Sequence, residues 1–129
     1  MITGCWAIAV LPAQAATIDP LYQPEAIQVP SGKTTEQVRQ VIHKVTNDKN
    51  WEVRDVGTGH IEARYFKKSR RNKVISAVID FHFDSRAIRI SYRESEGLDH
   101  NSQDGTIDST YNKWVRTFEK RLRKALNSY

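Results

Sequence analysis

The feature that most constrains the fold is a long amphipathic pattern near the carboxyl terminus, from Ile107 to Leu126. Apolar residues recur there in steps of three and four, the spacing that places side chains on one face of an α-helix. The apolar stripe consists of Ile107, Tyr111, Trp114, Val115, Phe118, Leu122 and Leu126. The opposite face carries the cations Lys113, Arg116, Lys120, Arg123 and Lys124. Such a long apolar stripe is unfavourable in water, so another part of the chain must cover it.

A second amphipathic pattern predicts a shorter helix that begins at Thr34 or Thr35 and runs to about Asp48. Thr34 and Gln37 have the spacing of a capping box, in which each side chain bonds the backbone of the other residue. The apolar stripe of this helix is Val38, Val41, Ile42 and Val45. The sequence thus predicts two helices, with the strand-forming residues between them.

Four segments between the helices alternate apolar and polar residues, with the period of two that is typical of half-buried strands. These segments are residues 51–55, 60–65, 74–83 and 88–93. Their connections, at 57–59, 67–73 and 84–86, are short, which favours antiparallel pairing of consecutive strands. A polar loop, residues 94–106, leads to the last helix.

Because one face of this sheet is apolar and the other is polar, both helices should cover the same face. The sequence therefore predicts an α+β two-layer sandwich in the order α-β-β-β-β-α, with a four-stranded antiparallel meander. We expect Trp51 and Trp114 to anchor its core. On the polar face, opposite charges on neighbouring strands should pair in a water-exposed surface.

The length of 129 residues suits one domain, which we place at residues 34–129. Residues 17–33 contain Pro20, Pro24 and Pro30. Since proline fixes φ and lacks an N–H, we expect an extended segment with no regular structure there. The net charge of +5 mildly favours anionic partners. The single cysteine excludes an internal disulfide and a zinc site built from several cysteines.

Residues 1–16 form an apolar leader without charged side chains, too short to span a bilayer, which takes about 20 residues. One interpretation is a secretory signal peptide, cleaved between Ala15 and Ala16 after an A-x-A motif. A second is a lipobox ending at Cys5, whose lipidation would anchor the protein to a membrane. These two predict a periplasmic location, and a third interpretation is an uncleaved apolar tail on a cytoplasmic protein. Neither signal has its usual basic start, so we expect that a basic segment precedes Met1 in the precursor.

Several short motifs stand out between residues 35 and 126. They are Val38-x-x-Val41-Ile42, Trp51-Glu52-Val53, Gly59-His60-Ile61-Glu62-Ala63, Ile90-Ser91-Tyr92-Arg93-Glu94-Ser95-Glu96-Gly97-Leu98 and Tyr111-Asn112-Lys113-Trp114-Val115. In these motifs, and most of all in the last, the chain resembles a group of small, largely uncharacterised periplasmic proteins and lipoproteins of Gram-negative bacteria. The resemblance implies a compartment and a fold, and it supplies no activity and no catalytic residue.

The polar residues carry no specific catalytic signature. Asp80 and His82 lie two apart on a strand and therefore on one face, where they could act as an acid–base couple. Ser76 shares that face, but an exposed polar strand explains all three residues equally well. The histidines, His43, His60, His82 and His100, lack metal-ligand spacing, although His60 and His82 could meet across neighbouring strands. We therefore predict no enzyme activity, no metal and no cofactor.

The strongest local charge signal is the segment 67–73, in which five of seven residues are cations. These are Lys67, Lys68, Arg70, Arg71 and Lys73. One interpretation is that they bind phosphate groups of lipid headgroups, lipopolysaccharide or nucleic acid. The other is a solvated hairpin tip whose charge discourages pairing between sheet edges.

The sequence therefore predicts a non-enzymatic cell-envelope protein that serves as a binding or structural module in the periplasm. Its partner would be another envelope protein or an anionic surface, and Cys5 would supply a membrane tether. The alternative is a nucleic-acid- or anionic-lipid-binding domain that uses the basic segment 67–73. Export argues against nucleic acid, because a periplasmic protein has little access to it.

Overall fold

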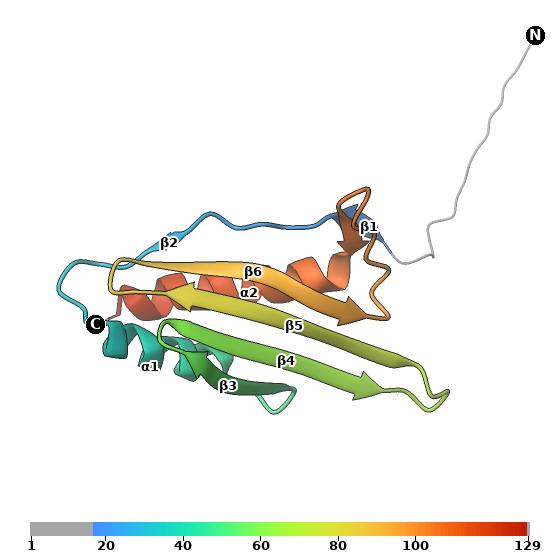
Figure 1. Cartoon of the computed structure of the whole chain (residues 1–129), viewed down its shortest axis with the longest axis horizontal. Coiled ribbons are helices and arrows are strands. Elements are labelled where there is room, and N and C mark those ends of the chain that lie inside the picture. Colours follow the sequence, from blue (N-terminus) through green and yellow to red (C-terminus); the bar gives the residue numbers. More distant parts are fainter. Residues whose placement is uncertain (1–16, 129) are drawn as a thin grey trace, which may run out of the picture.

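The computed structural model describes residues 17–128. Its helices and mainly antiparallel strands confirm the predicted α+β class. The elements in chain order are β1 (Ile18–Pro20), β2 (Ile27–Gln28), α1 (Thr35–Thr46), β3 (Trp51–Gly57), β4 (His60–Lys68), β5 (Val74–Phe83), β6 (Ala87–Glu96), β7 (Thr106–Asp108) and α2 (Ser109–Leu126). In Figure 1 the main sheet lies in front of both helices.

The main sheet has five strands in the order β2-β6-β5-β4-β3, and every neighbouring pair is antiparallel. The prediction of four strands is therefore wrong, because β2 adds to the edge of the sheet beside β6. Ile27 of β2 pairs with Ile88, and the side chain of Ile27 is buried. A strand of two residues is too short to show an alternating pattern, so periodicity could not reveal it.

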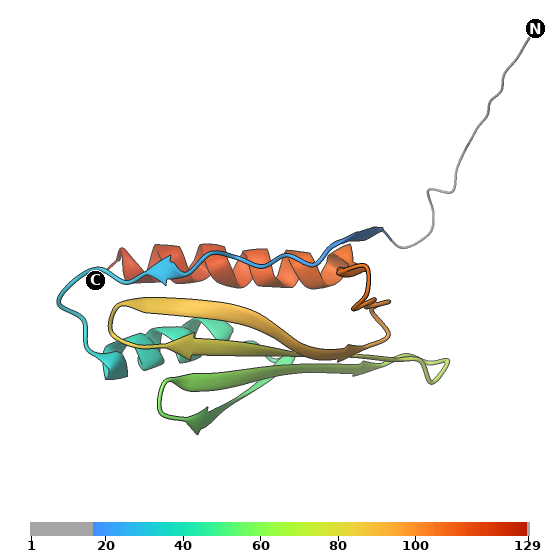
Figure 2. The ribbon, with the colours of Figure 1, turned by 45° about the horizontal axis from the view of Figure 1, so that its top comes forward.

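The other short strand, β1, pairs with β7 in a separate two-stranded sheet. The expectation that residues 17–33 have no regular structure is thus wrong in two places. Proline still limits both strands, since Pro20 ends β1 and β2 lies between Pro24 and Pro30. Figure 2 shows that the segment runs along α2.

Helix α1 begins as the capping box predicts. The backbone N–H of Gln37 donates to Thr34 Oγ1 over 3.1 Å, and the backbone N–H of Thr34 donates to Gln37 Oε1 over 2.8 Å. The helix ends at Thr46, slightly before the expected stop near Asp48. The Thr46 hydroxyl donates to the carbonyl oxygen of Ile42, which satisfies this buried polar group inside the last turn.

Helix α2 begins two residues later than the apolar pattern suggests. Ile107 belongs to β7, and Asp108 is the N-cap, whose side chain accepts a hydrogen bond from the N–H of Thr110. The side chain of Ile107 is nevertheless fully buried. A residue that packs against the core from a strand gives the same apolar signal as one at the start of the helix, so the pattern alone placed the boundary too early.

One hydrophobic core joins both helices to the inward face of the sheet. From the central strands it contains Ile61, Ala63, Ala77, Ile79, Phe81, Ile88 and Ile90. The loop expected from Glu94 starts later, because β6 continues to Glu96 through a β-bulge. There Tyr92 pairs with Ile79 and Glu94 pairs with Val78, so that Arg93 is the extra residue.

Candidate functional site

The outward face of the sheet carries a row of polar cross-strand partners, Arg54, Glu62, Asp80 and Ser91. Arg54 Nε lies 2.7 Å from Glu62 Oε2, in agreement with the expected pairing of opposite charges. The expectation that this face is fully exposed to water is wrong, because Glu62 is only 3% and Asp80 only 7% exposed. Long arginine side chains lie against these carboxylates and cover them.

Arg93 reaches both carboxylates from the bulge in β6. Its Nε lies 2.9 Å from Asp80 Oδ2 and 3.1 Å from Asp80 Oδ1, and its NH1 lies 3.8 Å from Glu62 Oε1. Burial alone would raise the pKa of Asp80, but the hydrogen bonds and charges of Arg93 and His60 lower it below its ordinary value. The Asp80 carboxylate is therefore held in its charged form.

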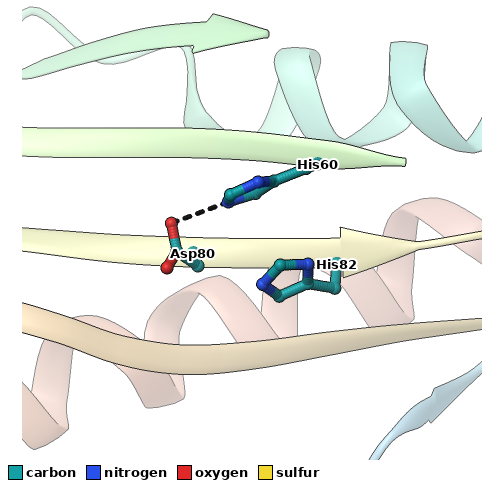
Figure 3. Close-up of side chains that lie close together, drawn as sticks. All are labelled: His60, Asp80 and His82. Atoms are coloured by element: carbon teal, nitrogen blue, oxygen red, sulfur yellow. Dashed lines mark hydrogen bonds and ion pairs between the residues drawn. The ribbon is translucent and has the colours of Figure 1, made fainter. Parts of the chain in front are cut away.

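Two histidines complete this cluster, which Figure 3 shows in close-up. His60 Nε2 lies 2.9 Å from Asp80 Oδ1. His60 and His82 face each other as cross-strand partners, and their rings stack with centroids 4.2 Å apart. The two residues thus meet across neighbouring strands, as the sequence allowed. Asp80 bonds His60 on β4, however, so the suggested Asp80–His82 couple is not the pair that forms.

The arrangement does not supply a nucleophile for acid–base chemistry. Ser76 lies opposite Phe66, four residues along β5 from Asp80. What the cluster offers is one ligating atom from each of His60, Asp80 and His82, all within 4.8 Å of one another. Sequence analysis overlooked the contributions of Glu62 and Arg93. Alternation placed Arg93 on the outward face, but only the bulge explains how it reaches two carboxylates.

The second candidate is the tip of the β4–β5 hairpin, where the structure places the predicted anion-binding residues. Figure 1 shows this tip extending beyond the rest of the sheet. Ser69 organises the turn: its Oγ accepts hydrogen bonds from the backbone N–H groups of Arg71 and Lys73, and its N–H donates to the Lys73 carbonyl oxygen. The five cations, Lys67, Lys68, Arg70, Arg71 and Lys73, are all exposed.

The side-chain nitrogens of these five cations form no ion pair and no hydrogen bond with the residues between 17 and 128. Elsewhere in the same range the guanidinium groups of Arg39, Arg54, Arg93 and Arg123 are ion-paired. Beside the cations, Phe66 is 62% exposed, which makes it the most exposed large apolar side chain that the structure describes. We call residues 66–73 the basic tip. It combines unpaired positive charge with one solvent-facing aromatic ring.

The cationic back of α2 is arranged differently. Arg123 pairs with Glu119 at 3.0 Å, and the guanidinium of Arg116 lies 4.3 Å from the centre of the Tyr22 ring. Figures 1 and 2 place the C-terminal end of α2 at the opposite end of the molecule from the basic tip. The two cationic regions therefore do not form one continuous surface at that end.

The remaining predicted sites, Cys5, Ala15 and Ala16, lie outside the described residues. Between residues 17 and 128, neither helix has the length and apolar character needed to cross a bilayer. Comparison with protein-family models, with curated proteins and with solved structures found no match for this chain.

Proposed function

We propose that this protein is a non-enzymatic module of the Gram-negative cell envelope, and that its basic tip binds the phosphate groups of anionic lipid headgroups. The observation that carries the proposal is the basic tip itself. Its five cations are exposed and unpaired, and they directly follow an exposed phenylalanine on a hairpin that extends beyond the sheet. Lysine and arginine near an anionic bilayer are attracted to its surface, and an aromatic ring can enter the interface beside them.

The position of the amino-terminal segment fits this orientation. In Figures 1 and 2, β1 lies at the same end of the molecule as the basic tip. A lipid on Cys5, as the sequence suggests, would hold that end close to the bilayer. Two weak attachments at one end would then act together, since a single lipid chain or a single basic patch binds only weakly and reversibly.

Phosphate groups also occur in nucleic acids, but the basic tip suits a membrane better. Proteins that bind single strands without sequence preference use a groove with several rings on which successive bases stack. The basic tip offers one exposed ring, because the neighbouring Tyr65 packs against Trp51 and Trp114. The periplasmic location expected from the leader and from the resemblance also favours lipid.

Sedimentation with vesicles tests the proposal. The full chain should bind vesicles that contain phosphatidylglycerol and not vesicles of phosphatidylcholine alone, and high salt should weaken the binding. Replacing Arg70 and Arg71 together by serine should weaken binding by roughly tenfold or more, since each cation near an anionic surface contributes measurably. The matched control replaces Arg121 and Lys124 by serine, which removes the same charge at the other end of the molecule.

Three results would contradict the proposal. The first is equal binding to the two kinds of vesicle, and the second is a control variant that loses as much binding as the basic-tip variant. A fluorescent single-stranded oligonucleotide, offered in competition, supplies the third. If it displaces the vesicles and its own binding depends on Arg70 and Arg71, the basic tip is a nucleic-acid site instead.

A further inference from the structure

We propose that His60, Asp80 and His82 form a binding site for a divalent transition-metal ion of the Zn²⁺ type. The site lies on the outward face of the sheet, at the end of β4 and β5 remote from the basic tip, and it does not depend on the function proposed above. Figure 3 shows the His60 ring reaching from β4 toward the Asp80 carboxylate on β5, with the His82 ring beside them on β5. One ligating atom from each residue lies within 4.8 Å of the other two.

The types of ligand fit this class of metal. Imidazole nitrogen and carboxylate oxygen both bind zinc, and sites with three protein ligands leave the remaining position to water. His82 is exposed, so an ion can approach from solvent and keep a water ligand on that side. Asp80 is buried between the strands that carry the two histidines, and its carboxylate supplies the anionic ligand for the cation.

The distances require only a small adjustment. Metal–ligand bonds of about 2.0–2.2 Å hold tetrahedral ligands roughly 3.4 Å apart. The ligating atoms already lie within 4.8 Å, and His60 Nε2 is 2.9 Å from Asp80 Oδ1. The His82 side chain is exposed, which leaves room for its ring to turn toward the other two ligands. The strand pairing of His60 with His82 fixes the two rings on the same side of the sheet.

Arg93 competes with a cation for Asp80, because its Nε contacts both carboxylate oxygens. The structure also holds an alternative partner for Arg93. Its NH1 lies 3.8 Å from Glu62 Oε1, so Arg93 can turn toward Glu62 when a metal takes Asp80. Glu62 is itself paired with Arg54. Arg93 therefore acts as a counter-charge for the site before the metal binds and limits its affinity.

The charges around the cluster come from four strands. They are Arg54 on β3, His60 and Glu62 on β4, Asp80 and His82 on β5, and Arg89, Arg93 and Glu94 on β6. Arg54, Arg89 and Arg93 face the carboxylates of Glu62, Asp80 and Glu94 there, and the Arg93 guanidinium occupies the Asp80 carboxylate that a dication needs. Removal of the Arg93 charge should consequently strengthen metal binding. A merely structural cluster gives no reason to expect such a gain.

Calorimetric titration of the full chain, without a histidine tag, with Zn²⁺ at neutral pH is the test. The expected result is one saturable site that is weakened at least tenfold by His82→Gln and is strengthened by Arg93→Gln. The matched control, His100→Gln, also removes one histidine and should leave the affinity unchanged. His82 is exposed, so its replacement should not unfold the chain, and circular dichroism of each variant verifies this.

Nuclear magnetic resonance supplies a second measurement that does not depend on variants. Addition of Zn²⁺ should shift the imidazole signals of His60 and His82 and leave those of His43 and His100 in place. Equal shifts of all four histidines, equal affinity of wild type and His82→Gln, or no saturable binding at all would each overturn the assignment.

Discussion

Asn112 on α2 holds the backbone of Tyr22, ninety positions earlier in the chain: its Oδ1 accepts a hydrogen bond of 2.9 Å from the Tyr22 N–H. Its Nδ2 donates to the carbonyl oxygen of Pro20 over 2.9 Å. One amide side chain, 1% exposed, thus pairs with the N–H of Tyr22 and the carbonyl of Pro20, directly where β1 ends. This contact fixes the amino-terminal segment along α2.

The first prediction concerns this contact. Asn112→Ala should lower the free energy of unfolding by about 1–3 kcal/mol, because it removes two hydrogen bonds made by a buried amide side chain. The Tyr22 amide should also exchange its hydrogen faster, which native-state hydrogen exchange measures directly. Asn50→Ala, at an exposed position, is the control and should change neither quantity. Unchanged exchange at Tyr22 in Asn112→Ala would show that other contacts hold the segment.

The second prediction concerns the aromatic cluster between α2 and the sheet. Trp114 packs against Tyr65, with ring centroids 4.4 Å apart, and edge-on against Trp51 at 5.4 Å. Both tryptophans pack against the core as expected, yet each keeps part of its surface exposed. Trp114→Ala should therefore destabilise the fold by roughly 2–4 kcal/mol in denaturant unfolding.

Phe66→Ala provides the comparison for Trp114. This aromatic side chain is 62% exposed, so its loss should change stability by less than about 0.5 kcal/mol. If Trp114→Ala changed stability as little as that, Trp114 would be a surface residue with a binding role, and its place in the core would be refuted.

The elements that could be predicted from the sequence are those whose signal is local. The capping residues Thr34 and Gln37, the alternation along β3 to β6 and the apolar stripe of α2 all lie within a few residues of the structure they specify. The basic tip was found for the same reason, since its cations are consecutive. Local chemistry determines these features, and the chain needs no distant partner to form them.

The features that could not be predicted depend on residues far apart in the chain. Ile27 belongs to a strand only because it pairs with Ile88 at the edge of β6. Asn112 has a structural role only because the fold brings Pro20 and Tyr22 next to its side chain. The burial of Asp80 follows from a bulge that no propensity indicates. The two histidines meet because the register of the β4–β5 pair places His60 opposite His82. That register is set by the turn that joins the two strands.

The third prediction is a pH dependence of stability that comes from Asp80. Its folded-state pKa is lowered: burial opposes this, but the hydrogen bonds from Arg93 and His60 prevail. A group with a lowered pKa stabilises the fold at pH values above its unfolded pKa, about 4 for aspartate, and this stabilisation is lost as the pH falls through the folded pKa. The stability difference between wild type and Asp80→Asn should therefore be largest near neutral pH and shrink below about pH 4.

Urea unfolding measured at several pH values checks this prediction. Asp99→Asn is the matched control, since Asp99 is exposed and forms no ion pair with residues 17–128. Its effect should vary less with pH than that of Asp80→Asn. A difference for Asp80→Asn that stays constant down to pH 2 would show that the Arg93 and His60 contacts do not favour the charged carboxylate.

The last prediction concerns Gly97, where the chain leaves β6. Gly97 has φ of 76°, and a Cβ there would overlap the carbonyl oxygen of Val74 at the start of β5. Gly105 has a similar φ of 68°, but a Cβ there would meet open space. The left-handed conformation alone should cost Gly105→Ala about 1–2 kcal/mol. Gly97→Ala adds a clash with fixed backbone and should cost roughly 2–4 kcal/mol in thermal or denaturant unfolding. Equal losses in the two variants would mean that backbone conformation alone selects glycine at position 97.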